Sequence, residues 1–185
     1  MFTDISDFSK ICAATTPFNV VALLNDLYNG FDGVIAKFDV YRVEIISSCQ
    51  LIVSGIPQEN GKNHLANLCD VALSMMEFVR SYKIPHKKEL KLTICIGLHT
   101  GPVAAAVVGL SAPRYCLFGD TVNMASRMES TGLSEAIQIS EAYNQKLATH
   151  FPEFRTTQRG LVSVKGKGEV MTYFLISKDE TFNLF

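Results

Sequence analysis

The most constraining feature of this sequence is the run Arg114–Gly132, which sets an apolar strand, a Gly-Asp turn and a helical segment in immediate succession. Gly119 permits a tight exit from the strand, and we expect Asp120 to cap the helix that follows. Asn123 and Arg127 are four residues apart on that helix and therefore share one face. An amide and a guanidinium on one face suit a ligand that builds negative charge on a phosphate, although the same pair also fits an ordinary solvated helix face.

The size and charge of the chain limit what it can be. It has 185 residues, of which 48% are hydrophobic, so it is long enough to bury one substantial core. We therefore predict a single domain over residues 1–185. The formal net charge of −1 provides no broad basic field, which argues against nucleic acid as a partner.

The cysteine content and the lack of long apolar runs indicate the compartment. Five cysteines are an odd number, and no two of them form a Cys-x-x-Cys pair, so we expect reduced thiols in an intracellular, cytoplasmic setting. No apolar run approaches the ~20 residues that a membrane helix needs, and the first residues lack a signal-peptide pattern. Any membrane connection would then belong to a longer parent, such as a receptor of which this is the intracellular part.

Helices and strands alternate along the predicted pattern. Apolar residues recur at helical spacing from Thr16-Pro17 to Phe38 and again over Leu65–Tyr82. Val40–Ile46 and Gln50–Ser54 are short β-rich runs around Ser47-Ser48, which predicts a hairpin with a polar tip.

The second half of the chain continues this alternation. We predict apolar strands at Leu90–His99 and Val103–Gly109, joined by a turn at residues 100–102, and further strands at Ile137–Ser140, Leu161–Val164 and Met171–Ile176, with a short helix at Glu141–His150. This order predicts an α+β sandwich in which helices pack on a mainly antiparallel sheet.

The run Arg114–Gly132 closely resembles the signature of class III nucleotide cyclases of the guanylyl type, as found in receptor guanylyl cyclases. The resemblance extends over about residues 2–175. It implies a ferredoxin-like fold, two subunits that meet head to tail with active sites at their interface, and conversion of GTP to 3′,5′-cyclic GMP with Mg²⁺ or Mn²⁺. Members of this family have several more apolar residues before the position of Phe2, so we expect the first strand to be truncated here.

Two residues match the positions that read the base in this family. Glu44 lies in Tyr41-Arg-Val-Glu-Ile45, which resembles the segment whose Glu accepts hydrogen bonds from guanine, and Cys116 matches the other guanine-type position. Adenylyl enzymes usually carry Lys and Asp there. Because guanine presents N–H donors where adenine presents an acceptor, the pair favours GTP.

The residues for the chemical step also match. The resemblance implies that Asn123 and Arg127 position the ribose and stabilise charge on the α-phosphate. Lys165, within Val164-Lys-Gly-Lys-Gly168, matches a lysine that binds the triphosphate, and the family register favours it over Lys167. A glycine-flanked lysine is also typical of an exposed turn.

The metal-binding half departs from the family. Asp4 matches one metal-binding Asp, and Ile5 matches a residue whose carbonyl joins the ion. Asp7 stands where the family has Gly, and Ser47-Ser48 replaces Gly-Asp, so that Ser48 occupies the position of the second metal Asp. A neutral hydroxyl is a poor substitute for a carboxylate on Mg²⁺, so we expect weak metal binding unless Asp7 supplies the missing charge.

Three functions fit these residues. The leading one is a guanylate cyclase domain whose homodimer activity is in question because of Ser48. The second is a pseudo-cyclase subunit that dimerises and regulates without turnover, as a homodimer or with another cyclase subunit. The third is an interaction module of ferredoxin-like fold, which the combination of Glu44, Cys116, Asn123, Arg127 and Lys165 disfavours.

Overall fold

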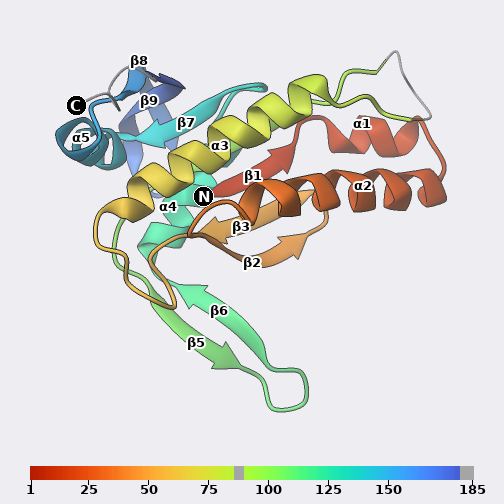
Figure 1. The fold of residues 1–185 in the computed structure, drawn as a ribbon, viewed down its shortest axis with the longest axis horizontal. Coiled ribbons are helices and arrows are strands. Elements are labelled where there is room, and N and C mark those ends of the chain that lie inside the picture. Colours follow the sequence, from red (N-terminus) through yellow and green to blue (C-terminus); the bar gives the residue numbers. More distant parts are fainter. Residues whose placement is uncertain (86–89, 180–185) are drawn as a thin grey trace.

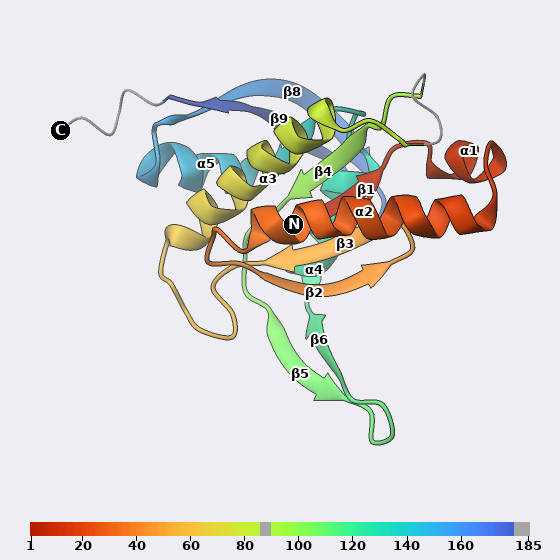
Figure 2. The same cartoon turned by 45° about the vertical axis from the view of Figure 1, so that its right-hand side comes forward.

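The computed structural model describes residues 1–85 and 90–179, in which helices and strands alternate (Figures 1 and 2). The helices are α1 (Phe8–Ala13), α2 (Pro17–Ile35), α3 (Asn63–Ser81), α4 (Asp120–Ser130) and α5 (Glu141–His150). The strands are β1 (Phe2–Ile5), β2 (Tyr41–Ile46), β3 (Cys49–Val53), β4 (Ile94–Leu98), β5 (Ala104–Val108), β6 (Arg114–Phe118), β7 (Ile137–Ser140), β8 (Phe154–Val164) and β9 (Gly168–Lys178).

Seven strands form one sheet in the order β2-β3-β1-β4-β7-β9-β8. Every neighbouring pair in it is antiparallel except β4 with β7. The unit β1-α2-β2-β3-α3-β4 has the strand order of a ferredoxin-like fold, and this confirms the predicted α+β class. Strands β5 and β6 form a separate hairpin that projects from the body of the domain (Figure 1).

Helices cover both faces of the large sheet. On one face, α2, α3 and α5 bury a common core that includes Leu27, Leu65 and Tyr143. On the other face α4 packs against β4, β7 and β1. A Cβ on Gly97 of β4 would lie 2.0 Å from the backbone nitrogen of Glu129, so a glycine is needed for α4 to come this close.

Several local predictions are confirmed. Thr16 caps α2, because its hydroxyl accepts a hydrogen bond from the Asn19 amide at 3.3 Å. Ser47 and Ser48 form the turn between β2 and β3. The strand Ile137–Ser140 and the helix Glu141–His150 have the predicted bounds. All five cysteines are free.

Other predictions were wrong. Gly119, with φ of 136°, is the residue that caps α4, and Asp120 is the first residue of the helix itself. Strand β4 begins at Ile94, where its pairing with β1 begins, and not at Leu90.

Pairing between distant strands explains the remaining differences. Strand β5 pairs with β6 and lies outside the sheet that contains β4. Strands β4 and β5 therefore do not form a hairpin with each other. Strands β8 and β9 have 11 residues each because they pair along their whole length, beyond the apolar runs that predicted them. The sequence pattern also missed α1, a six-residue helix with no buried residue.

Among residues 1–85 and 90–179, no helix combines the length and the apolar character needed to cross a membrane.

Candidate functional site

Helix α4 has one face of buried side chains and other faces whose side chains are accessible to a ligand. Met124, Ala125 and Met128 are buried against the sheet and its last strands. Asn123 is exposed and Arg127 is half-buried on another side of the helix. Within the described part of the chain, neither of these two side chains makes a hydrogen bond or an ion pair, so both can serve a ligand.

The turn between β8 and β9 is held against α4 by a small apolar cluster. Val164 and Val170 of this hairpin pack with Met124 and Met128 of the helix. Lys165 directly follows the buried Val164 and is itself exposed. The packing therefore holds the turn that carries Lys165 beside the helix that bears Asn123 and Arg127.

An ion pair distinguishes the two lysines of this turn. Lys167 Nζ lies 2.7 Å from Asp120 Oδ2 at the start of α4. Lys165 has no ion-pair or hydrogen-bond partner among residues 1–85 and 90–179. Lys165 is consequently the lysine of this turn whose ammonium group is not engaged by the described residues.

The two candidate base-reading residues lie on strands that meet through aromatic rings. Glu44 is exposed on β2, and Cys116 is half-buried on β6, where it pairs with Ala106. Tyr41 of β2 and Tyr115 of β6 pack edge to face, with ring centroids 5.9 Å apart. This contact brings together two strands that belong to different sheets.

Asp4 lies at the other end of α4, beside the turn between β2 and β3. Its Oδ1 accepts a hydrogen bond from the Ile5 amide at 2.8 Å. Burial, and next the negative charge of Asp4, raise the pKa of the Tyr28 hydroxyl to about 12. The same hydroxyl donates to the Ser47 carbonyl at 2.8 Å. The structure thus brings Asp4 and Ser47-Ser48 to one end of the sheet.

Sequence reasoning missed Glu129, which belongs to the surroundings of Asp4. Burial, and next the charge of Asp4, raise the pKa of Glu129 to about 7. Burial is also the main cause that raises the pKa values of Cys49 and Cys95 to about 12, and carboxylates add to it. The sequence contained a signal for Glu129, because a carboxylate in the last turn of a helix interacts unfavourably with the helix dipole and is therefore unusual there.

Asp7 is directed to a different partner. It adopts the left-handed conformation, with φ of 54°, which glycine adopts most readily. Its carboxylate is exposed and pairs with Lys10 Nζ at 2.9 Å. In the described residues, no three His, Cys, Asp or Glu side chains converge as a metal site. Asp4 is therefore the one carboxylate of the sequence-predicted metal set that lies at this end of the sheet.

Asp4 and the β8–β9 turn lie near different ends of one helix, and Arg127 belongs to its last turn. Asp120 at the start of α4 contacts the β8–β9 turn, whereas Glu129 near its end interacts with Asp4. Eleven residues of α-helix span roughly 16 Å at 1.5 Å per residue. The turn that carries Lys165 is thus held at the start of α4, whereas the charge of Asp4 acts on Glu129 near its end.

Comparison with known proteins identifies the family. Residues 1–177 match the family described as the adenylate and guanylate cyclase catalytic domain. The chain belongs to this family. The resemblance drawn from the sequence is thereby confirmed.

The relatives of this cyclase domain include receptors. It is 52% identical over 178 residues to the receptor-type guanylate cyclase gcy-23 of Caenorhabditis elegans. The aligned region covers 96% of this chain and 17% of that protein. It is 47% identical over 180 residues to guanylate cyclase 32E of Drosophila melanogaster, 97% of this chain and 15% of that protein. The chain therefore spans less than a fifth of the length of these relatives.

Solved structures share the fold. The guanylate cyclase domain of RhGC from Catenaria anguillulae, in complex with GTP, matches with a TM-score of 0.88 and 35% identity, covering 96% of this chain and 94% of that chain. The non-canonical dimeric guanylyl cyclase domain of the RhoGC fusion protein from the fungus Blastocladiella emersonii matches with a TM-score of 0.84 and 33% identity, covering 96% of this chain and 94% of that chain.

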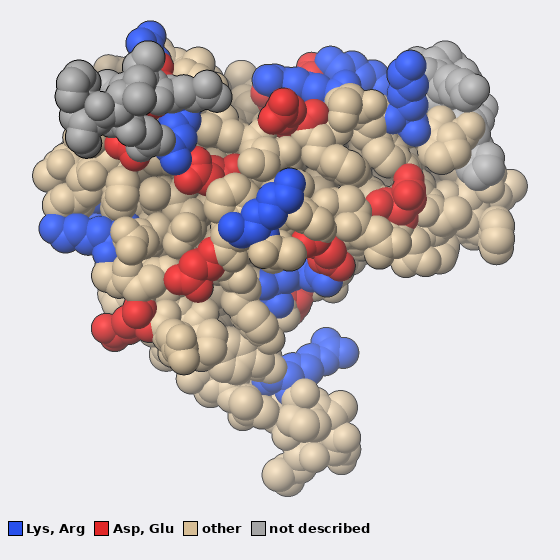
Figure 3. Space-filling view, in the orientation of Figure 1, with Lys and Arg blue, Asp and Glu red and all other residues tan. Residues whose placement is uncertain are grey.

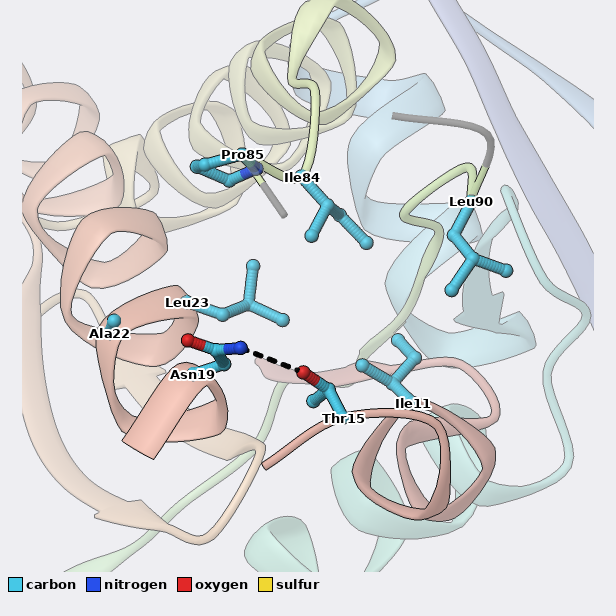
Figure 4. Close-up of a pocket in the computed structure, with 8 residues that line it drawn as sticks. All are labelled: Ile11, Thr15, Asn19, Ala22, Leu23, Ile84, Pro85 and Leu90. Carbon is cyan, nitrogen blue, oxygen red and sulfur yellow. Dashed lines mark hydrogen bonds between the residues drawn. The ribbon is translucent and has the colours of Figure 1, made fainter. Parts of the chain in front are cut away.

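The cyclase domain also has a small apolar cavity of about 50 Å³ between α1, α2 and the segment that follows α3 (Figure 4). Ile11, Leu23 and Ile84 line it, and Asn19 Nδ2 donates to Thr15 Oγ1 at 3.2 Å beside it. This volume is far below the 300 Å³ or more of typical ligand pockets, so the cavity is a packing gap and not a nucleotide site.

Proposed function

We propose that this domain is a guanylate cyclase catalytic domain that converts GTP to 3′,5′-cyclic GMP and pyrophosphate. The single observation that carries the proposal is the arrangement at α4. Asn123 and Arg127 have free side chains on the helix, and Lys165 lies unpaired on the turn that packs against it. The identity to receptor guanylate cyclases supports the same reaction.

The reaction assigns a task to each of these side chains. The 3′-oxygen of the ribose attacks the α-phosphorus, the bond from phosphorus to the β-phosphate oxygen breaks, and the 3′ proton is lost to solvent. Arg127 stabilises the charge that grows on the α-phosphate, because a guanidinium is a fixed fork of donors. Asn123 orients the ribose, and Lys165 holds the triphosphate. Placement and electrostatics account for most of the rate in such phosphoryl transfer.

Base selection is assigned to Glu44 and Cys116. The carboxylate of Glu44 accepts hydrogen bonds from the N1–H and N2–H₂ groups of guanine, which adenine does not offer at that edge. The exposure of Glu44 on β2 leaves it open to a ligand, and the Tyr41–Tyr115 contact supports its proximity to β6.

We propose that the active site forms between two chains. Asp4 and the turn that carries Lys165 lie near different ends of α4, so we assign them to different chains at one nucleotide. The projecting β5–β6 hairpin exposes Val107, Val108 and the fully exposed Leu110, an apolar surface suited to a second subunit. The hairpin tip is without charge in the space-filling view (Figure 3). The partner is a second copy or another cyclase subunit.

Cyclases of this family use divalent metal ions, and Mg²⁺ or Mn²⁺ is the proposed cofactor. The residues of this chain fit such a site poorly. Asp4 and the Ile5 carbonyl are present, but Ser48 has no charge and Asp7 is paired with Lys10. We therefore expect weak metal binding when both metal ligand sets come from this chain.

That poor fit favours a second candidate function, a pseudo-cyclase subunit that dimerises and regulates a partner without turnover in its own homodimer. The two candidates differ in one measurement, metal-dependent formation of cyclic GMP by the chain alone. Glu44, Cys116, Asn123, Arg127 and Lys165 are equally present in both.

The decisive experiment measures cyclic GMP formation from GTP with Mn²⁺ for the chain alone and for the chain mixed with a cyclase subunit that carries both metal carboxylates. We expect little turnover alone and clear turnover on mixing, which Arg127→Ala in this chain removes. Ser47→Gly, Ser48→Asp and Asp7→Gly together are expected to raise turnover of the homodimer by orders of magnitude. Absence of turnover in every mixture and in the triple variant would assign the regulatory role.

The proposal extends to the protein that contains this domain. Residues 1–185 are taken as a single cyclase domain of a longer protein. The receptor-type relatives, of which the chain covers 17% or less, support a place in the cytoplasmic part of a membrane receptor.

A further inference from the structure

Strand β2 contains one residue more than the stretch of β3 with which it pairs. Between its pairs with Ile52 and Cys49, β2 has three residues where β3 has two. The register shifts between Arg42 and Glu44, which makes Val43 the extra residue of a β-bulge. A bulge changes the direction of the side chains that follow it, and here the next residue is Glu44.

The bulge decides on which face of the sheet Glu44 lies. Residues directly opposite each other on neighbouring strands share a face. Glu44 lies opposite Leu51, and Leu51 lies opposite Phe2 of β1. Phe2 in turn lies opposite Gly97, the glycine against which α4 packs. Glu44 is therefore on the face of the sheet that α4 covers.

Regular pairing would place Glu44 on the opposite face. Continued from Arg42 without an extra residue, it would set Glu44 opposite Gln50. Gln50 is two residues from Ile52, so both are on one face, and Ile52 belongs to the main core beneath α2 and α3. The Glu44 carboxylate would then be turned away from α4.

The bulge also brings Glu44 to the same face as Tyr41. The two residues are three positions apart, and this odd separation puts side chains on opposite faces of a regular strand. The extra residue cancels the offset. Tyr41 packs on Tyr115 of β6, and Cys116 is the next residue of that strand. Glu44 consequently lies on the face through which β2 meets the strand of the other candidate base-reading residue.

Helix α2 holds the bulged stretch at both ends. Arg42 forms an ion pair with Asp32, in which Arg42 Nη2 also lies 3.4 Å from Asp32 Oδ2. Beyond the bulge, the Tyr28 hydroxyl donates to the Ser47 carbonyl at 2.8 Å. Tyr28 and Asp32 are four residues apart and share one side of α2. Because both ends of the stretch are fixed, the extra residue has to be accommodated between them.

We propose that Arg42 is a positioning residue for base selection, because its ion pair with Asp32 holds the β-bulge at Val43 that turns Glu44 to the face of Tyr41. Arg42 lies on the opposite face and acts through Glu44, so its role depends on the proposed reading of guanine by Glu44. An ion pair that only stabilises the domain would affect unfolding alone. One that holds the bulge also affects the choice between GTP and ATP.

The test measures the competition of GTP and ATP for a fluorescent nucleotide analogue on the full chain. We expect Arg42→Ala to reduce the preference for GTP at least about fivefold, as for the loss of one base-edge contact. Asp32→Asn should have the same effect, and the double variant should lose no more than either single variant. Arg155→Ala, the matched control, removes the ion pair with Asp179 from β8 at the other edge of the sheet and should leave the preference unchanged.

Deletion of Val43 separates the bulge from the ion pair. Without the extra residue, regular pairing already sets Glu44 opposite Leu51. The deletion variant should therefore keep the preference for GTP, and Arg42→Ala should no longer change it. Cross-strand nuclear Overhauser contacts report the register without any nucleotide. We expect contacts of Glu44 with Leu51 in the unmodified chain and with Gln50 in Arg42→Ala.

The outcomes distinguish the positioning role from the base assignment. If Glu44→Ala abolishes the preference for GTP and Arg42→Ala leaves it intact, Arg42 is not a positioning residue and the base assignment stands. If Glu44→Ala has no effect, the base assignment fails. Contacts of Glu44 with Leu51 that persist in Arg42→Ala, or an effect of Arg42→Ala that persists after deletion of Val43, would overturn the proposal.

Discussion

Lys167 Nζ lies 2.7 Å from Asp120 Oδ2, and this contact ties the turn between β8 and β9 to the first residue of α4. Because Lys167 is held in this way, Lys165 is the lysine of the turn that is free to meet a ligand. The same contact keeps the turn beside the helix that carries Asn123 and Arg127.

Exchange of each lysine for alanine distinguishes the proposed binding of triphosphate by Lys165 from the ion pair that Lys167 forms with Asp120. In a mixture with a cyclase subunit that carries both metal carboxylates, we expect Lys165→Ala to raise the KM for GTP by about 10- to 100-fold, since a charged hydrogen bond contributes about 1.5–3 kcal/mol. Lys167→Ala, the matched control, loses a largely exposed ion pair and should change KM less than about fivefold. Steady-state kinetics of cyclic GMP formation measures both, and equal losses in the two variants would contradict the assignment.

Base preference depends on Glu44 and Cys116. We expect the unmodified chain to bind GTP more tightly than ATP, and Glu44→Lys with Cys116→Asp to reverse the order, because the exchanged groups complement the edge of adenine. Competition of both nucleotides for a fluorescent analogue measures the preference. The single exchange Glu169→Gln, on the exposed start of β9, serves as a control that leaves the preference unchanged.

We expect a glycine-to-alanine exchange to have opposite effects on stability at two positions, Gly97 and Gly33. Gly97→Ala places a Cβ 2.0 Å from the Glu129 backbone, so α4 must move, and overpacking of this kind costs about 1–3 kcal/mol. In Gly33→Ala of α2, the new Cβ has no atom of the described residues within 4 Å, so this exchange should stabilise the helix by about 0.5–1 kcal/mol. Urea unfolding measures both free energies. A harmless Gly97→Ala would show that α4 does not depend on this close approach.

Two buried glutamines differ in their partners. Within residues 1–85 and 90–179, neither side-chain polar atom of Gln50 has a hydrogen-bond partner. Gln138 Nε2, in contrast, donates to Thr131 Oγ1 at 2.9 Å, and Gln138 Oε1 accepts from Arg159. An unpaired buried polar group costs about 1–3 kcal/mol, so Gln50→Met should raise the free energy of unfolding by that order. Gln138→Met should lower it, because Arg159 then loses a partner. Chemical denaturation compares the two, and a loss of stability in Gln50→Met would argue that water satisfies this side chain.

The free energy of unfolding of the domain should fall in mild acid, because His99 is buried in its neutral form. Burial lowers the pKa of His99 below its ordinary value of 6.5, so below pH 6.5 the unfolded chain binds a proton that the folded chain does not. Stability is therefore full above pH 6.5 and declines as the pH falls below it. His99→Gln should reduce the drop in melting temperature between pH 7.5 and 5.5. His150→Gln, at the last residue of α5, removes a histidine from another part of the domain and serves as the control for the exchange itself.

The amino-acid sequence by itself determined the helices and strands whose stabilising pattern is local. The apolar spacing of α2 and α3, the cap at Thr16 and the polar turn Ser47-Ser48 depend on residues close together in the chain, so periodicity and turn chemistry predict them. The signature run likewise placed Asn123 and Arg127 on one face of a helix, because their spacing alone decides that. The site roles of these residues stay predictions.

Only the tertiary structure decided features that join distant parts of the chain. The pairing of β5 with β6 outside the main sheet, the contact of Lys167 with Asp120 and the influence of Asp4 on Glu129 link residues far apart in sequence. Their free energies come from packing, burial and charge across elements, which a local pattern does not contain. The sequence therefore determined which chemical groups the domain has, and the fold decided which of them are paired and which stay free.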